Sequence, residues 1–255
     1  MKNCLILGAG RSGTSMVAGS LRLAGYEMGE GLKPPTSSNP LGYFETVEIN
    51  DINEDLLRPV VARWEGRPVS RWAIPHPRLE KDQHWLACLP PDVEVEPVAQ
   101  LEARIRRAVA RTPYCFKDPR FCYTLPVWRP WLAPDTVFVC VFRQPGRTIA
   151  SMLRDAQEQP YLKSLGLNSC YAWQVWIHMY DRVVRHHRRQ GRWLFLHSDS
   201  VVRGPGLRRL SRFLEAPVDS TFPKASLQRA PEMRPIPRAA LILYWKMRLL
   251  SWLPA

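Results

Sequence analysis

Glycine-rich residues between a short apolar run and a helix-forming run are the strongest chemical signal in this chain. Residues 5–16 read Leu-Ile-Leu-Gly-Ala-Gly-Arg-Ser-Gly-Thr-Ser-Met. At such a junction, free backbone N–H groups and the positive end of the helix dipole hold an anion, and glycines let the backbone close around it. The segment therefore predicts a phosphate-binding loop.

One template for this loop is the dinucleotide fingerprint G-x-G-x-x-G, which Gly8, Gly10 and Gly13 satisfy. That template also needs a second strand that ends, about 20 residues further on, in an acidic residue for the ribose hydroxyls. Glu27 and Glu30 lie near that distance, but the residues around them make a poor strand. The dinucleotide interpretation fails at this point.

The other template is the Walker A loop, in which Thr14 stands where the lysine belongs. A nucleoside triphosphatase also needs an apolar strand that ends in aspartate for Mg²⁺, whereas residues 137–142 are followed by Arg143. What remains is a loop that binds a phosphate, carries Arg11 inside it and shows no sign of a metal site. Transfer of a sulfuryl group, which is less charged than a γ-phosphoryl group, fits this description.

A second anion site is expected at residues 139–151, where a buried strand ends at Arg143 and a helix carries Ser151 eight positions later. Ligands of open α/β sheets bind at the carboxyl ends of the strands. A bidentate Arg143 and the Ser151 hydroxyl can close on one anionic group. The alternative, from this segment alone, is that Arg143 pairs with a carboxylate.

Together these segments resemble the sulfotransferases that use 3'-phosphoadenosine 5'-phosphosulfate (PAPS), in their bacterial and tyrosylprotein branch. Residues 11–15 are similar to the family's 5'-phosphosulfate loop, and Arg143-x-Pro-x-x-x-x-x-Ser151 is similar to its 3'-phosphate motif. Residues 39–45 and 117–120 are similar to further segments of that branch. The resemblance implies a sulfotransferase with PAPS as co-substrate, no metal, and a parallel α/β sheet related to nucleotide kinases.

The loop is then expected to hold the 5'-phosphate of PAPS. The groups that would do so are backbone N–H groups and two hydroxyls, from Ser12, Gly13, Thr14 and Ser15. Arg11 is expected to reach both the 5'-phosphate and the bridging oxygen, and so to stabilise the leaving group.

Lys117 lies at the end of an expected strand, and the resemblance implies that it neutralises the sulfuryl oxygens or the leaving group. The simpler alternative is a salt bridge between Lys117 and the neighbouring Asp118.

Glu45 is the expected general base, because that branch uses a glutamate in this region and a loop at residues 33–43 can fold over the phosphate loop. Burial near Tyr43 and Phe44 is expected to raise the pKa of Glu45 toward neutrality. Glu48, one helical turn later, is the rival base, and a carboxylate that merely stabilises a helix start is the plain alternative for both.

The elements that must position these residues alternate short apolar runs with longer helical ones. Strands are expected at 3–7, 114–117, 136–142 and 193–196, and helices at 14–24, 47–57, 79–89, 98–111, 146–157, 170–190, 206–215 and 239–252. Continuous apolar strands separated by helices predict an α/β fold, a P-loop-type three-layer domain with a central parallel sheet flanked by helices. In the helix at 170–190, the basic side chains Arg182, Arg185, Arg188 and Arg189 are expected to face solvent.

Composition predicts a folded globular protein with an uneven positive charge. The 255 residues include 36 lysines and arginines against 23 acidic residues, for a net charge of +13, and residues 178–255 hold 15 basic and 5 acidic side chains. A basic surface attracts phosphates, nucleic acid, anionic lipid or an acidic metabolite. Two alternatives to a sulfotransferase follow: a P-loop nucleotide or small-molecule kinase, and a non-catalytic anion-, nucleic-acid- or membrane-binding protein. Nucleic acid is not expected, since no basic strand face interleaved with aromatics is present.

A single domain is expected over residues 1–255, with an acceptor-side insertion at 56–97 and a Pro-rich segment with a basic apolar helix at 216–255. The helix at 239–252 has three interpretations: packing on the domain, a partner, or peripheral membrane contact. The acceptor is expected to be a small-molecule, sugar or peptide hydroxyl, with Trp64, Trp72, Trp85 and Tyr161 as candidates to stack on it. The sequence does not indicate an oligomeric state.

A cytoplasmic location is expected, since no signal peptide or bilayer-length apolar run is found. The six cysteines form no C-x-x-C pair. They are therefore expected to be reduced core thiols rather than a zinc site.

Overall fold

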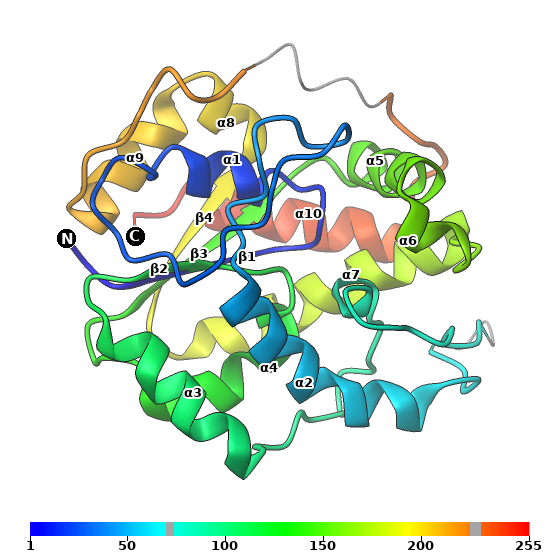
Figure 1. The fold of residues 1–255 in the computed structure, drawn as a ribbon. Coiled ribbons are helices and arrows are strands. Elements are labelled where there is room, and N and C mark those ends of the chain that lie inside the picture. Colours follow the sequence, from blue (N-terminus) through cyan, green and yellow to red (C-terminus); the bar gives the residue numbers. More distant parts are fainter. Residues whose placement is uncertain (70–73, 225–230, 255) are drawn as a thin grey trace.

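The computed structural model describes residues 1–69, 74–224 and 231–254, and its centre is a parallel β-sheet (Figure 1). Its strands, in the order β2-β1-β3-β4, are β1 (Cys4–Leu7), β2 (Cys115–Lys117), β3 (Val137–Phe142) and β4 (Arg192–His197). The α/β fold with a parallel sheet is therefore confirmed, and each expected strand lies within a residue or two of its expected bounds.

Alternate strand residues enter two different cores, one on each face of the sheet. In β1, Leu5 and Leu7 belong to the larger core, whereas Cys4 and Ile6 belong to the smaller one. All four side chains are fully buried. Because side chains alternate along a strand, burial on both faces requires an unbroken apolar run, which is why these strands show no polar alternation.

Helices cover both faces of the sheet (Figure 1). The smaller core is closed by α1 (Thr14–Gly19), α8 (Ser198–Val202) and α9 (Pro205–Leu214). The larger core is closed by α2 (Val47–Trp64), α3 (Ala99–Ala110), α4 (Phe121–Trp128), α5 (Pro145–Glu158), α6 (Pro160–Lys163), α7 (Ser169–Arg185) and α10 (Arg238–Leu250). Short 3₁₀ turns lie at His84–Leu86, Arg129–Trp131 and His187–Arg189.

Four expected helices differ clearly from those observed, and two of them are shorter: α1 ends at Gly19 rather than at residue 24, and α7 ends at Arg185 rather than at residue 190. α2 continues past residue 57 and through Pro59 to Trp64, because Val60 and Val61 extend its buried face. The prediction of a helix at 79–89 was wrong, since only a single 3₁₀ turn forms there. Asp82 has a φ of 70°, and a left-handed residue at this point is incompatible with a continuous helix.

Of the arginines expected to face solvent, Arg185 in α7 and Arg188 and Arg189 in the following 3₁₀ turn are exposed, whereas the expectation is wrong for Arg182. The buried Arg182 guanidinium donates to the carbonyls of Pro90 (2.7 Å) and Val93 (2.6 Å). It thereby satisfies backbone groups of an irregular segment that would otherwise lie unpaired beside the core.

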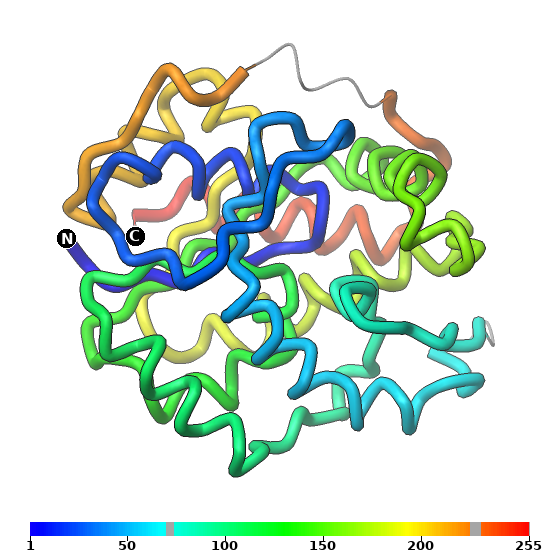
Figure 2. Tube along the Cα trace, in the orientation of Figure 1, coloured from blue at the N-terminus to red at the C-terminus, as the bar shows by residue number. Residues whose placement is uncertain are grey.

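Described residues of both the expected insertion and the expected C-terminal segment contribute to the larger core, among them Leu86 and Leu243. Residues 65–69 and 74–98, between α2 and α3, run mainly as irregular chain, and the domain boundaries remain a prediction. α10 packs on α7 and β4 through Ala240, Leu243 and Met247. Figure 2 shows both ends of the chain on the same side of the molecule, where Lys2 and Leu253 each hydrogen-bond residues of α9.

Among the described residues, none of the helices has the length and apolar character needed to cross a membrane. All six cysteines are free thiols; five are buried, and Cys170 is exposed.

Candidate active site

A cavity of about 690 Å³ opens at the carboxyl edge of the sheet. Every strand contributes to its wall: the loop after β1, Lys117 at the end of β2, Arg143 after β3 and Ser198 after β4. The neighbouring strands β1 and β3 lead into helices on opposite faces of the sheet, α1 on one and α5 on the other. Open α/β sheets bind ligands beside the carboxyl ends of two such strands.

The loop after β1 has the backbone that an anion site needs. Gly8 has a φ of 145°, and a Cβ there would lie 2.2 Å from the Val141 carbonyl oxygen, so no larger residue fits. Gly13, with a φ of 95°, caps α1. The first N–H groups of a helix have no partner within it, so those of Thr14 and Ser15 face the cavity as free donors.

Ser12 differs from its neighbours in this loop. Its side chain is buried and hydrogen-bonds the Tyr180 hydroxyl (2.8 Å), while its N–H donates to the carbonyl of Ala9 (3.2 Å). The cavity wall comprises Gly13, Thr14 and Ser15 rather than Ser12.

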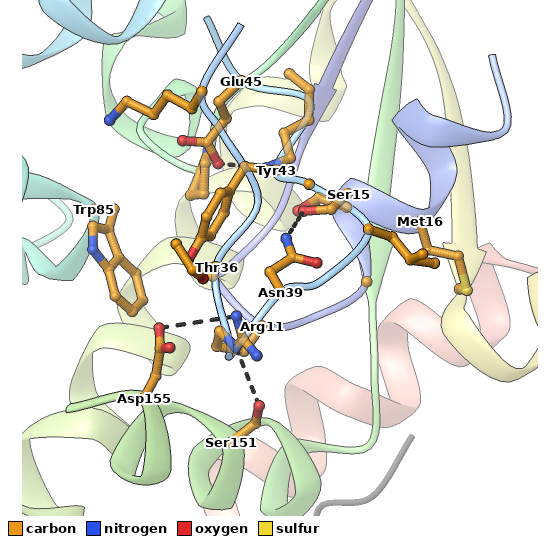
Figure 3. Close-up of a pocket in the computed structure, with 18 of the residues that line it drawn as sticks. Arg11, Ser15, Met16, Thr36, Asn39, Tyr43, Glu45, Trp85, Ser151 and Asp155 are labelled. Atoms are coloured by element: carbon orange, nitrogen blue, oxygen red, sulfur yellow. Dashed lines mark hydrogen bonds and ion pairs between the residues drawn. The ribbon is translucent and has the colours of Figure 1, made fainter. Parts of the chain in front are cut away.

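Arg11 joins the two expected anion sites. Its Nε donates to Ser151 Oγ (3.2 Å) and its Nη2 donates to the Ser38 carbonyl (2.8 Å). Nη1 lies 3.9 Å from the carboxylate of Asp155 on α5 (Figure 3). Arg11 has a φ of 68°, an uncommon value for a residue with a side chain, and such conformations persist where the surroundings impose them.

Arg143 is a buried cation, and two of its guanidinium nitrogens pair with none of the described residues. The side chain is 7% exposed and lines the cavity, yet among the described residues no acceptor pairs with its Nε or Nη2. Burial lowers the pKa of this guanidinium, as do the nearby Arg147 and Arg11, against the opposing pull of Asp199. Buried donors left unpaired are costly, and an anion from solution would satisfy them.

Glu45 and Lys117 form a buried salt bridge in the cavity wall, and a nitrogen of Arg120 lies 4.0 Å from the other Glu45 oxygen. Burial raises the pKa of Glu45, but Lys117, Arg120 and Lys33 together outweigh burial and leave that pKa below its usual value. The expectation that burial would move this pKa toward neutrality was therefore wrong. The carboxylate is ionised at neutral pH because cations surround it.

The other carboxylates near the site are held by different partners. Glu48 accepts from the Glu30 N–H (3.0 Å) and pairs with Arg111, and it is not part of the cavity wall. Asp118, the alternative partner for Lys117, instead bonds Arg120 (3.1 Å).

A buried polar network braces the floor behind Lys117. Arg120 pairs with Glu54 on α2 (2.5 Å), which also bonds His84. Asp118 accepts from the amides of Asn50 (2.8 Å) and Asn53 (2.9 Å). Removing one partner from a buried ion pair typically costs about 3–5 kcal/mol, so this network fixes α2 against β2.

The loop at residues 33–43 is closed at its base and is hydrogen-bonded to the loop after β1. The Lys33 N–H donates to the Glu45 carbonyl (2.8 Å), and the Asn39 amide donates to Ser15 Oγ (3.3 Å). Phe44 has a φ of 51°, packs edge-on against Phe222 and immediately precedes Glu45. This left-handed residue turns the chain so that the Glu45 side chain enters the cavity (Figure 3).

Aromatic and charged side chains form the opposite wall of the cavity. Of the four aromatic candidates, Trp85 and Tyr161 line the cavity, Trp64 does not, and Trp72 lies outside the described residues. Trp85 packs on the phosphate loop, since a Cβ on Gly10 would lie 2.4 Å from its ring.

Sequence reasoning missed Asp155 and Ser198, which also line the cavity. Asp155 is 3% exposed, and no described residue hydrogen-bonds its Oδ1. Asp155 could have been predicted from its spacing, because it lies one helical turn after Ser151 on the same face of α5. Ser198 directly follows β4, so the rule for strand ends was the signal for the second.

Among the residues that the structure describes, no group of three or more histidine, cysteine, aspartate or glutamate side chains is arranged to hold a metal ion.

The fold is similar to that of two solved sulfotransferase domains. The domain from the Synechococcus olefin synthase has 18% identity and a TM-score of 0.51, over 97% of this chain and 96% of that one. The domain from the curacin biosynthetic pathway has 14% identity and a TM-score of 0.51, over 97% and 98%. No family model matches this chain, and no curated protein matches it significantly in sequence. At these identities, the likeness establishes a shared α/β fold.

Proposed function

We propose that this protein is a sulfotransferase that moves the sulfuryl group of PAPS to a hydroxyl acceptor. Arg143 carries the proposal: it is a buried guanidinium, two of whose nitrogens pair with no described residue, in the wall of the cavity that also contains the phosphate loop. PAPS has phosphates at both ends of its ribose, so it needs two anion sites in one cavity. The shared fold with sulfotransferase domains supports this choice.

In the proposed binding mode, the N–H groups at the start of α1 and the hydroxyls of Thr14 and Ser15 hold the 5'-phosphate. Arg143 and Ser151 bind the 3'-phosphate. Arg11 already bonds Ser151 and lies between the two sites, so its remaining N–H groups can serve the bridging oxygen.

The proposed reaction is an in-line displacement at sulfur. The acceptor oxygen forms the new bond to sulfur while the bond from sulfur to the bridging oxygen breaks, and its electron pair stays on the 5'-phosphate. Glu45 takes the acceptor proton, and Lys117 neutralises the sulfuryl and bridging oxygens. The products are a sulfate ester and adenosine 3',5'-bisphosphate.

The Glu45–Lys117 salt bridge gives the two residues complementary tasks in this scheme. As negative charge develops at the bridging oxygen, Lys117 is drawn toward it and its hold on Glu45 weakens. The carboxylate then becomes a stronger base at the moment when the acceptor proton must leave.

Trp85 and Tyr161 are proposed to form part of the acceptor wall, with a small-molecule, sugar or peptide hydroxyl as the acceptor. A cytoplasmic location and independence from metal ions stay predictions.

The test is a thermal-shift comparison of adenosine 3',5'-bisphosphate with adenosine 5'-phosphate, followed by transfer of labelled sulfate from PAPS to phenols, sugars and peptides. We expect the bisphosphate to stabilise the protein much more than the monophosphate, and at least one acceptor to be sulfated in the presence of a chelator. Mg²⁺-dependent ATP turnover without any response to the bisphosphate would instead assign the site to a kinase.

A further inference from the structure

The outward face of α10 is an apolar stripe that nothing in the described structure covers. Its members on the helix are Leu241, Ile242, Trp245 and Leu249, and it continues through Trp252 and Leu253 just after the helix. Trp245 is 57% exposed, Leu249 59% and Trp252 65%. These are the largest exposed apolar side chains of the C-terminal segment, and they lie together.

The stripe is distinct from the face that holds α10 on the domain. At about 100° per residue, the exposed positions fall on one side of the helix, and the buried Ala240, Leu243 and Met247 fall on the other. Packing against α7 and β4 therefore accounts for one apolar face and leaves the second unexplained.

Cations border the stripe on both edges. Lys246 flanks it on one side and Arg248, which lies over the Trp252 ring at 5.6 Å, flanks it on the other. Arg238 is exposed at the start of the helix, and α10 contains no acidic residue. Long basic side chains beside exposed tryptophan and leucine are typical of helices that lie in the headgroup region of a bilayer.

Helix α9 meets the end of the stripe through Arg209. α9 carries Arg208, Arg209 and Arg212, and Arg209 donates to the carbonyls of Ser251 and Leu253 at the end of the stripe. Residues 178–255 hold 15 basic and 5 acidic side chains, an excess of 10 positive charges. Of the basic side chains in this range that the structure describes, only Lys224 lines the cavity, since Arg11, Lys117 and Arg143 all lie outside the range.

We propose that the α10 stripe docks on an anionic lipid bilayer, with its tryptophan and leucine side chains in the headgroup boundary and its basic side chains on lipid phosphates. Charge complementarity favours a bilayer with anionic lipid over a second copy of this chain, because two such stripes would bring like charges together. The proposal does not depend on the sulfotransferase assignment, since it uses no residue of the cavity.

The experiment is vesicle flotation with the full chain, comparing phosphatidylcholine vesicles with vesicles that also contain phosphatidylglycerol. We expect binding to the anionic vesicles only, and a loss of binding as salt is raised. The stripe variant Trp245→Ser/Leu249→Ser should bind at least tenfold more weakly, and Lys246→Gln/Arg248→Gln should also bind more weakly. The matched control Leu23→Ser/Leu32→Ser, which removes exposed leucines elsewhere, should bind like wild type.

Circular dichroism and thermal unfolding of each variant separate loss of binding from loss of fold. The proposal is overturned if the wild type does not float with anionic vesicles, or if the stripe variant floats equally well. It is also overturned if sedimentation shows a dimer that the stripe variant abolishes while vesicles are ignored, because a second copy would then cover the stripe.

Discussion

The Glu45 carboxylate is surrounded by cations, and this decides what it can do as a base. Lys117, Arg120 and Lys33 outweigh the effect of burial and lower the pKa of Glu45, so it is ready to accept a proton at any pH near neutrality. A low pKa also makes it a weak base until Lys117 is drawn away. In the proposed reaction, the basicity of Glu45 therefore increases as the bond from sulfur to the bridging oxygen breaks.

Glu45→Gln should reduce turnover by about 10²- to 10⁴-fold, because proton removal by a positioned base contributes about that much. Affinity for adenosine 3',5'-bisphosphate, measured by calorimetry, should change little. Glu48→Gln is the matched control, since Glu48 is occupied by Arg111 outside the cavity wall, and it should keep near-normal turnover. Near-normal turnover in Glu45→Gln would disprove the base assignment.

Arg143→Ala should remove the preference for a 3'-phosphate. Charge-assisted hydrogen bonds contribute about 1.5–3 kcal/mol, so the affinity ratio of PAPS to adenosine 5'-phosphosulfate should fall by about tenfold to a hundredfold. Arg154→Ala, which removes an exposed arginine of α5, should leave this ratio unchanged. An unchanged ratio in Arg143→Ala would mean that another group binds the 3'-phosphate.

At the scale of elements, the phosphate loop packs directly against the 3₁₀ turn at His84–Leu86. The Trp85 ring lies so close to Gly10 that a methyl group there would come within 2.4 Å of it. An irregular segment far along the chain thus packs against the loop that we propose binds the anion.

Gly10→Ala should weaken bisphosphate binding, because the ring or the loop must move, and overpacking of this kind costs about 1–3 kcal/mol. Trp85→Ala in the Gly10→Ala background should restore part of the affinity, since the clash is then gone. Calorimetric titration of the single and double variants gives the coupling between the two positions. Strictly additive effects would show that the contact does not matter for binding.

The sequence allowed prediction of the strands, because each is a short apolar run with both faces buried. It did not reveal α4, whose residues Phe121–Trp128 include Pro126 and a run of aromatic side chains. Burial of Phe121, Tyr123 and Trp128 against the sheet stabilises this helix despite its poor local propensity. Local patterns cannot report such tertiary stabilisation.

Within the site, the residues expected from the two motifs, apart from the buried Ser12, line the cavity at the carboxyl edge, because strand ends determine where they lie. Their partners were not predictable: the Glu45–Lys117 pair joins positions 72 residues apart, and Arg11 meets Ser151 across 140. The wrong pKa direction for Glu45 followed from this, since burial was visible in the sequence and the cations around it were not.

At the scale of the whole molecule, buried neutral histidines make stability depend on pH. Burial lowers the pKa of His76 and of His197 to about 4, and that of His187 to about 3. In the unfolded chain, a histidine takes up its proton below about pH 6.5. Because the folded protein binds fewer protons, stability is complete above that pH and is lost as the pH falls toward 4.

The free energy of unfolding should therefore fall between pH 6.5 and 4 by up to about 1.4 kcal/mol per pH unit for each of these histidines. Urea denaturation at a series of pH values measures the slope. His187→Gln, whose amide can still donate to the Cys122 carbonyl, should reduce the slope by one proton's share. A free energy of unfolding that does not change across this range would show that these histidines bind protons in the native state as they do in the unfolded chain.

The distribution of the cysteines makes the native protein a single-site substrate for thiol reagents. Cys170, at the start of α7, is exposed, whereas the other five thiols are buried, and burial raises the pKa of Cys4, Cys88, Cys122 and Cys140. Since the thiolate is the reactive form, a maleimide should add one equivalent to the folded chain and six after denaturation, as intact mass will report. A fluorophore or spin label can thus be attached at one defined position without removing any native cysteine.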